Sequence, residues 1–340
     1  MEFGADVKGA ARFVSRFAAA GPLDGSYLVD DVAKSIDRLI LEAEPLIAAE
    51  TGFEPPSPAK ARVLSRAQWA EANIDPMLTM MAPILERGRQ RLSSSPVGTL
   101  SKLMYGPALG AQMGTILGIL STRVLGQYDV VMGHDNEVWF VGPNIVLMER
   151  RLGFVPRDFR LWVVLHELTH RSQFEGNAWV RDHFMGLVGG LLGSLEIEPG
   201  AIFGRLLGSL KDRDGSPIAL RLLSEEQREN FERVQAFMSV IEGHGNFVMD
   251  RIAEDTIPTQ PRMRRMFRSG ASTSPLNKIL GKLLGLDLKR AQYEQGQKFF
   301  DAVFEHGGST AVASCFESAE ALPTLAEIRA PERWLARARA

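Results

Sequence analysis

The spacing of apolar residues predicts a mainly helical protein. Apolar positions recur with helical periodicity over residues 27–50 and 67–91, and segments 53–59 and 93–97, rich in proline and serine, end these two stretches. Ser224 and Gln227 form a capping box that is predicted to start a long helix ending near Glu254. We therefore expect a single domain over residues 1–340, with packed helices in residues 1–125.

Two short segments carry the pattern of β-strands. Residues 128–132 and 138–141 are rich in β-branched and aromatic side chains, and residues 133–137 between them have the composition of a hairpin turn. Residues 262–268 are strongly basic and are predicted to form a loop, with helices expected before it and at about 274–284 and 288–305. The expected fold is mainly α with a small β-hairpin or sheet.

Residues 103–122 raise the question of a membrane span. They contain no charged side chain, and a glycine recurs at every fourth position, namely at Gly106, Gly110, Gly114 and Gly118. A proline, polar residues and the glycines themselves make this stretch only mildly apolar, and small residues also let helices of water-soluble proteins pack closely. We expect a buried core helix and no membrane span; the alternative is a membrane anchor.

Charge and cysteine content limit the classes of partner and metal site. Lys and Arg total 39 against 41 for Asp and Glu, so the net charge of -2 gives no reason to expect binding to nucleic acid. Cys315 is the single cysteine, which excludes an internal disulfide and a cysteine-rich metal site. Together with the lack of a signal-peptide pattern in the first thirty residues, this predicts a cytoplasmic protein whose metal ligands are histidine and carboxylate.

The clearest chemical signal is an HExxH motif on the helix predicted to begin at Pro156. Residues four apart on a helix differ by about 40° in azimuth, so His166 and His170 project from one face and Glu167 lies beside them. Two neutral imidazoles can hold Zn²⁺ with one more protein ligand, which leaves a position for water, and Glu167 can take a proton from that water. The neighbouring residues are strongly apolar, so the helix is expected to be buried, where such polar groups need partners.

Glu242 is the expected third metal ligand. It falls within the apolar face of the helix that starts after Ser224, where an unpaired carboxylate would be unfavourable, although pairing with an arginine is the alternative. Gly243 and Gly245 follow it, which indicates that another backbone or a metal centre comes close. His244 lies about 160° from Glu242 around the helix; it is a candidate for orienting a ligand or stabilising a transition state, or it is a structural histidine.

Several segments resemble the zincin-like metallopeptidases of the second type, which in actinobacteria are also labelled hydrolases associated with biosynthesis of the deazaflavin redox coenzyme. The segments are residues 158–170, 173–174, 179–184, 242–250 and 285–296. The resemblance implies a site similar to that of gluzincins, whose third zinc ligand is a Glu followed by Gly on a later helix, and that pattern maps onto Glu242. One departure is that Arg171 and Ser172 follow His170, where stricter zincin patterns have uncharged residues.

The site and the resemblance together predict a zinc-dependent hydrolase acting on a peptide or other amide. Glu167 would serve as general base and pass its proton to the leaving nitrogen, and Tyr293 is a candidate donor to the oxyanion, or else a core aromatic. The strand at 138–141 could supply edge hydrogen bonds to an extended substrate. The rival interpretation is a non-catalytic zincin-like protein in which zinc joins two helices and the surface binds a partner.

Overall fold

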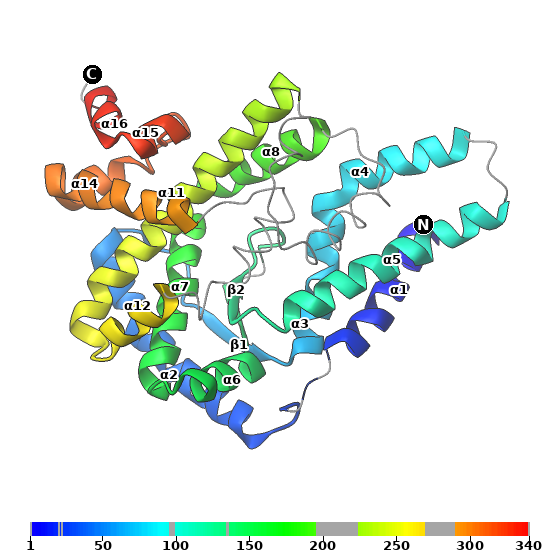
Figure 1. Ribbon diagram of the computed structural model, residues 1–340, viewed down its shortest axis with the longest axis horizontal. Helices are drawn as coiled ribbons and strands as arrows, with labels where there is room; N and C mark the ends of the chain where they lie inside the picture. The colour runs from blue at the N-terminus through cyan, green and yellow to red at the C-terminus, as the bar shows by residue number, and fades with distance from the viewer. Residues whose placement is uncertain are drawn as a thin grey trace.

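The computed structural model describes residues 2–19, 21, 23–94, 99–133, 136–194, 224–268 and 290–338. Within them the chain is mainly helical with one three-stranded sheet, as the sequence predicts (Figure 1). The helices are α1 (Glu2–Ala19), α2 (Tyr27–Thr51), α3 (Arg66–Ala72), α4 (Ile74–Ser94), α5 (Thr99–Ser121), α6 (Gly142–Leu152), α7 (Pro156–Glu175), α8 (Ala178–Ser194), α11 (Glu225–Thr256), α12 (Gln260–Arg268), α14 (Arg290–Ser314), α15 (Leu325–Arg329) and α16 (Pro331–Arg337). The strands are β1 (Lys60–Leu64), β2 (Gly126–Tyr128) and β3 (Glu137–Val141).

Local signals explain where the helices around the site begin. The Ser224 hydroxyl accepts from the backbone N–H of Gln227, and the Gln227 side chain accepts from the backbone N–H of Ser224, so the predicted capping box of α11 is present. Pro156 occupies the first turn of α7, where its missing N–H costs nothing. Both helices therefore start at the residues that the sequence indicates.

Two predicted segments differ in the structure. The helix expected over residues 67–91 is interrupted at Asn73, which separates α3 from α4. The side-chain amide of Asn73 donates to the carbonyl of Trp69 in α3. The basic segment 262–268 is not a loop but most of α12, because Met263 is 1% exposed and anchors one face of this helix in the core. The helix predicted at 274–284 lies outside the described residues, and that at 288–305 corresponds to α14.

The sheet has the order β1-β3-β2, with β1 parallel and β2 antiparallel to β3. The predicted hairpin exists, but its first strand is Gly126–Tyr128 and not 128–132. The reason is Asp129, whose carboxylate accepts from the backbone N–H groups of Val131 and Met132 and turns the chain. Because β3 is the central strand, the expectation that residues 138–141 offer a free edge is wrong; β2 is the edge that lies against α7.

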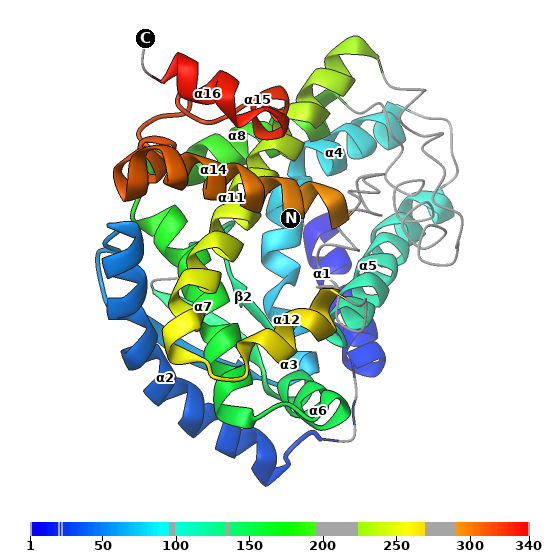
Figure 2. The same ribbon diagram turned by 60° about the vertical axis from the view of Figure 1, so that its left-hand side comes forward.

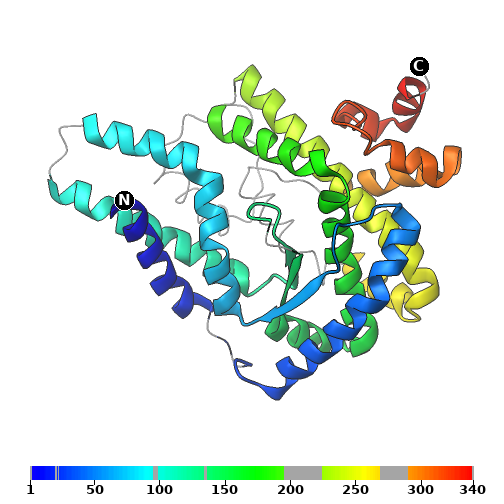
Figure 3. The ribbon, with the colours of Figure 1, turned by 180° about the vertical axis from the view of Figure 1, so that it is seen from behind.

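The amino-terminal helices pack around their own hydrophobic cluster beside the larger core. The smaller cluster joins α1, α3, α4 and α5 to one face of β3, and α1 and α5 lie side by side in Figures 1 and 3. A Cβ on Gly110 would lie 2.2 Å from the carbonyl oxygen of Val7, and one on Gly114 would lie 2.4 Å from that of Ala11. The glycine spacing of α5 thus serves close packing on α1.

None of the described helices is long and apolar enough to cross a bilayer.

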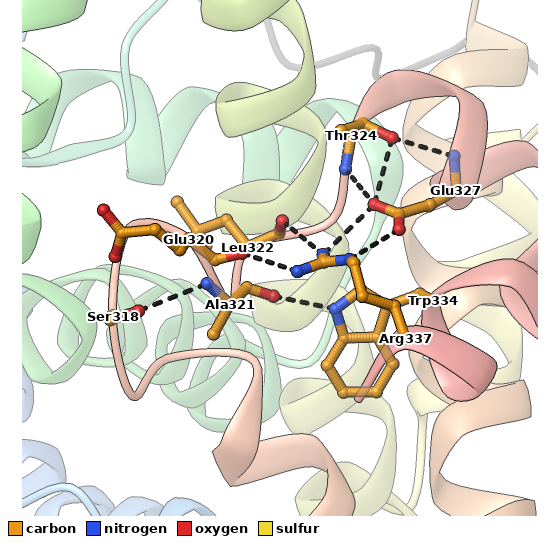
Figure 4. Close-up of polar contacts among 8 residues, drawn as sticks. All are labelled: Ser318, Glu320, Ala321, Leu322, Thr324, Glu327, Trp334 and Arg337. Atoms are coloured by element: carbon orange, nitrogen blue, oxygen red, sulfur yellow. Dashed lines mark hydrogen bonds and ion pairs between the residues drawn. The ribbon is translucent and has the colours of Figure 1, made fainter. Parts of the chain in front are cut away.

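The carboxy-terminal helices α15 and α16 are held by one arginine (Figure 4). The Arg337 guanidinium donates to the Glu327 carboxylate at 2.7 Å and to the carbonyl oxygens of Glu320 and Leu322. The Trp334 indole N–H donates to the Ala321 carbonyl at 2.7 Å, and its ring is 2% exposed. These contacts close the end of the chain over α14 and α11.

Candidate metal centre

Helix α7 carries the HExxH motif through the middle of the larger core. It contacts α2, α6, α8 and α11, as well as β2 and β3, and α7 and α11 lie against one another in Figure 2. The side chains of Val163, Val164, Leu165 and Leu168 are at most 3% exposed, which confirms the expected burial of this helix. His166 and His170 face α11, and both side chains keep a small exposed fraction.

Three side chains from these two helices bring one ligand atom each to a common point. His166 Nε2 and His170 Nε2 are 3.2 Å apart, His170 Nε2 lies 4.0 Å from Glu242 Oε1, and the three ligand atoms all lie within 4.8 Å of one another. A tetrahedral zinc ion about 2.0–2.1 Å from each of two nitrogens separates them by roughly 3.3 Å. The histidine pair already has this separation, and the Glu242 oxygen is slightly farther away.

The second ring nitrogen of each histidine has a different partner. His166 Nδ1 lies 3.2 Å from the thioether sulfur of Met249, and His170 Nδ1 lies 2.9 Å from the amide oxygen of Gln173. Burial and the neighbouring His170 ring hold the pKa of His166 well below its ordinary value, so His166 is neutral. A neutral imidazole is the form that binds a metal.

Glu167 lies between α7 and the edge strand β2. It is 8% exposed, and burial, with the nearby Glu242 charge as a second cause, raises the pKa of its carboxyl to about 8, although the backbone N–H of Tyr128 hydrogen-bonds to it and acts in the opposite direction. A Cβ on Gly126 would lie 2.5 Å from Glu167 Cγ, so the strand approaches this side chain through a glycine. The carboxyl is therefore positioned by the sheet edge.

The glycines after Glu242 allow two close approaches, as the sequence indicated. A Cβ on Gly243 would lie 2.4 Å from the carbonyl carbon of Gly296, where α14 crosses α11. A Cβ on Gly245 would lie 3.3 Å from Cε1 of His170. One glycine thus admits a neighbouring backbone, and the other leaves room for the imidazole of His170.

The structure places His244 apart from the three ligand atoms. It is 1% exposed and packs against the rings of Phe53, Phe300 and Phe316, while its Nδ1 lies 2.9 Å from the Gln173 amide nitrogen. Burial, followed by the nearby His170, lowers the pKa of His244 to about 3. His244 therefore contacts Gln173, a neighbour of the three candidate ligands, and its predicted role in catalysis stays a prediction.

The side chain of Tyr293 falls outside the described part of the structure, although its backbone belongs to the first turn of α14. Its predicted role stays a prediction.

Arg171, the departure from stricter zincin patterns, has a structural role. It is 1% exposed and pairs with Glu44 at 2.9 Å and with Glu175 at 2.7 Å, and it also donates to the Ser57 carbonyl. These contacts tie α7 to α2 and to the segment before β1. The arginine points away from the histidine face, so it does not compete with a metal.

Gln173 was missed as a candidate functional residue. It is fully buried and donates from its amide nitrogen to the Ile241 carbonyl at 2.9 Å, besides its contacts with His170 and His244. The sequence does contain one indication of its role. Gln173 follows His170 by three residues, which places its amide on the same face of the helix as the His170 ring.

Comparisons with known proteins identify the family of this chain and a similar crystal structure. The chain belongs to the zincin-like metallopeptidase family, whose model matches residues 6–335. A crystal structure from Chloroflexus aurantiacus, described as that of a candidate hydrolase with a novel fold, is 31% identical in sequence and has a TM-score of 0.73. Its alignment covers 98% of this chain and 97% of that chain. No protein of curated function matches.

Proposed function

We propose that this protein is a zinc-dependent hydrolase that cleaves a peptide or another amide bond. The observation that carries the proposal is the convergence of His166 Nε2, His170 Nε2 and Glu242 Oε1 within 4.8 Å of one another. Membership of the zincin-like metallopeptidase family supports the same reaction class. The buried cysteine Cys315, which has no disulfide partner, fits the cytoplasmic location that we propose.

The donor set fits zinc. Two imidazole nitrogens and one carboxylate oxygen are the protein ligands of many catalytic zinc sites, and the separation of the two nitrogens matches tetrahedral geometry. The two imidazoles turn ring nitrogens toward each other at 3.2 Å, and a cation between them would bind both nitrogens. Zinc bound here would polarise the substrate carbonyl and lower the pKa of a water molecule at its remaining position.

Glu167 would take the proton from that water. Its carboxyl belongs to the residue next to His166 and lies at the edge of β2, where the backbone N–H of Tyr128 donates to it. The same group would then donate the proton to the leaving nitrogen. Backbone groups of β2, the strand at the sheet edge beside α7, are the candidates for hydrogen bonds to an extended substrate, in place of those of β3.

The rival function is a structural zinc site that joins α7 to α11. Structural zinc sites have four protein ligands, whereas catalytic sites have three and leave a position for water. Among the described residues, the group of His, Cys, Asp and Glu side chains close enough to share a metal contains only His166, His170 and Glu242. Three ligands favour catalysis over a structural role.

Elemental analysis and peptide cleavage test the proposal. The purified full-length protein should bind close to one zinc per chain, and His166→Ala and His170→Ala should lose it. Glu167→Gln should retain zinc and the wild-type melting temperature but lose cleavage of a peptide library followed by mass spectrometry, by about 10²–10⁴-fold. Wild-type protein that takes up no zinc, or a Glu167→Gln variant that cleaves at the wild-type rate, would contradict the proposal.

A further inference from the structure

Gln173 links the two helices that carry the candidate ligands. Its side chain is fully buried between α7 and α11 and makes three contacts of 2.9 Å: Oε1 with His170 Nδ1, and Nε2 with both the Ile241 carbonyl oxygen and His244 Nδ1. Ile241 immediately precedes Glu242 in the chain. One amide therefore contacts a candidate ligand on α7 and the backbone beside the candidate ligand on α11.

The Ile241 carbonyl determines which way the amide points. A carbonyl oxygen can only accept a hydrogen bond, so the Gln173 atom 2.9 Å away must be the NH₂ group. The reverse orientation would place two oxygens against each other in a buried site. The other end of the amide, which faces His170, is consequently the oxygen.

The orientation of the amide in turn places the proton of His170. An amide oxygen only accepts, so His170 Nδ1 carries a hydrogen and donates it to Gln173 Oε1. Neutral imidazole has one N–H, which leaves the lone pair on His170 Nε2. This is the nitrogen that lies 3.2 Å from His166 Nε2 and 4.0 Å from Glu242 Oε1, at the candidate metal centre.

The opposite arrangement follows for His244. The second hydrogen of the Gln173 NH₂ group points to His244 Nδ1, so Nδ1 accepts and the ring hydrogen is on Nε2. An accepting nitrogen requires a neutral ring, and the apolar surroundings of Phe53, Phe300 and Phe316 favour that form. His170 and His244 therefore carry their hydrogens on different nitrogens because they face opposite ends of one amide.

We propose that Gln173 is the positioning residue of the site: it holds His170 with Nε2 free for the metal, and it fixes α11 so that Glu242 lies opposite. This inference rests on the proposed zinc site. Metal-bound histidines commonly donate their other N–H to a neighbouring acceptor, and loss of such a partner costs about 10–100-fold in metal affinity. Here the acceptor also anchors the helix of the third ligand.

Histidine NMR of the metal-free full-length protein tests the proton positions directly. The chain has six histidines, and ¹⁵N-histidine labelling distinguishes protonated from bare ring nitrogens, with His170→Ala and His244→Ala variants for assignment. At neutral pH the wild-type protein should show His170 with its hydrogen on Nδ1 and His244 with its hydrogen on Nε2. The reverse result for His170 would overturn the proposal.

Two substitutions separate positioning from packing. Gln173→Met keeps the length of the side chain but removes its contacts with His170, Ile241 and His244, so His170 should populate both tautomers, and the zinc Kd should rise about 10–100-fold. Gln173→Glu keeps the acceptor for His170 but loses the donor to the Ile241 carbonyl, so it should preserve the His170 tautomer and move the His244 hydrogen to Nδ1. Its zinc Kd should lie between those of Gln173→Met and wild type, because His170 stays oriented while α11 loses its anchor. Gln260→Met, which removes another buried amide, one that donates to Asp250, is the control and should change neither readout.

The outcomes distinguish this proposal from the proposed function. Unchanged tautomers and an unchanged zinc Kd in Gln173→Met would refute a positioning role. A wild-type protein with the expected tautomers that binds no zinc would refute the zinc site and leave Gln173 as a structural link. If Gln173→Met does not fold, the wild-type spectrum and the Gln173→Glu variant still decide the question.

Discussion

Gly126 in β2 lies directly against the side chain of Glu167 in α7. A Cβ at position 126 would lie 2.5 Å from Glu167 Cγ and 2.8 Å from its Oε1, closer than real atoms approach. Gly126→Ala should therefore displace the carboxyl from the Tyr128 N–H. Because a misplacement of about 1 Å at a reacting group costs about 10²-fold in rate, kcat/KM for peptide hydrolysis should fall by about that factor while bound zinc stays constant.

Gly189→Ala is the matched control for this prediction. Gly189 is an exposed helical glycine in α8 with no atom near the position of an added Cβ. Alanine there should leave hydrolysis unchanged and stabilise the helix slightly. Equal rates for Gly126→Ala and wild-type protein would show that the sheet edge does not position Glu167.

Replacement of Glu242 tests the third ligand. Glu242→Gln puts a neutral amide in place of a charged oxygen, so zinc should bind much more weakly. The melting temperature of the wild-type protein should rise with added zinc, since a ligand at about 1,000 times its Kd adds roughly 4 kcal/mol to the free energy of unfolding, and Glu242→Gln should lose most of that rise. Glu254→Gln, an exposed position on the same helix, should behave as wild type.

The opposite pattern would identify another ligand. If zinc affinity survives Glu242→Gln and disappears in His244→Ala, the metal is bound by three histidines, and α11 is rotated relative to its position in the structure. Zinc titrations of both variants at one pH, with melting temperatures recorded alongside, measure this.

Arg171 should matter for stability and not for metal binding. Its guanidinium is 1% exposed and pairs with Glu44 and Glu175, both of which retain some contact with solvent. Arg171→Met removes the positive charge that pairs with both carboxylates and should reduce the free energy of unfolding by about 2–4 kcal/mol in urea denaturation. Zinc content below that of wild type in the folded variant would show that Arg171 also shapes the metal site.

The contact between Arg337 and Glu327 predicts a pH-dependent contribution to stability. Burial raises the pKa of Glu327, but hydrogen bonds from Arg337 and from Thr324 together lower it by more, so the net shift of the pKa is downward. A carboxyl whose pKa is lowered by folding stabilises the protein above its unfolded pKa of about 4.3, and that contribution is lost as the pH falls through the folded value.

Arg337→Met should thus reduce the free energy of unfolding by about 1–2 kcal/mol at pH 7. The difference from wild type should become smaller as the pH falls below about 4, because protonation of Glu327 weakens the same contact in the wild-type protein. Arg333→Met, an exposed position on α16, is the control for helix propensity. A difference that stays constant between pH 7 and pH 3 would show that charge on Glu327 contributes nothing.

Helix geometry explains why part of the candidate site could be read from the sequence. His166 and His170 are four residues apart on one helix, so their shared face follows from the 3.6-residue turn before any tertiary contact forms. The apolar face of α11 likewise required that Glu242 be buried, because the surrounding positions have to enter the core. The starts of α7 at Pro156 and of α11 after Ser224 could also be predicted, because each depends on residues within one helical turn.

Long-range packing decided the rest. The pairing of β1 with β3, the use of β2 as the edge beside Glu167, and the folding of residues 262–268 as a helix depend on contacts between segments far apart in the chain. The same is true of Gln173, whose partners on α11 lie 68 and 71 residues away along the chain. Local spacing determined which side chains share a face of a helix, whereas the packing of α7 against α11 and β2 determined what those side chains meet.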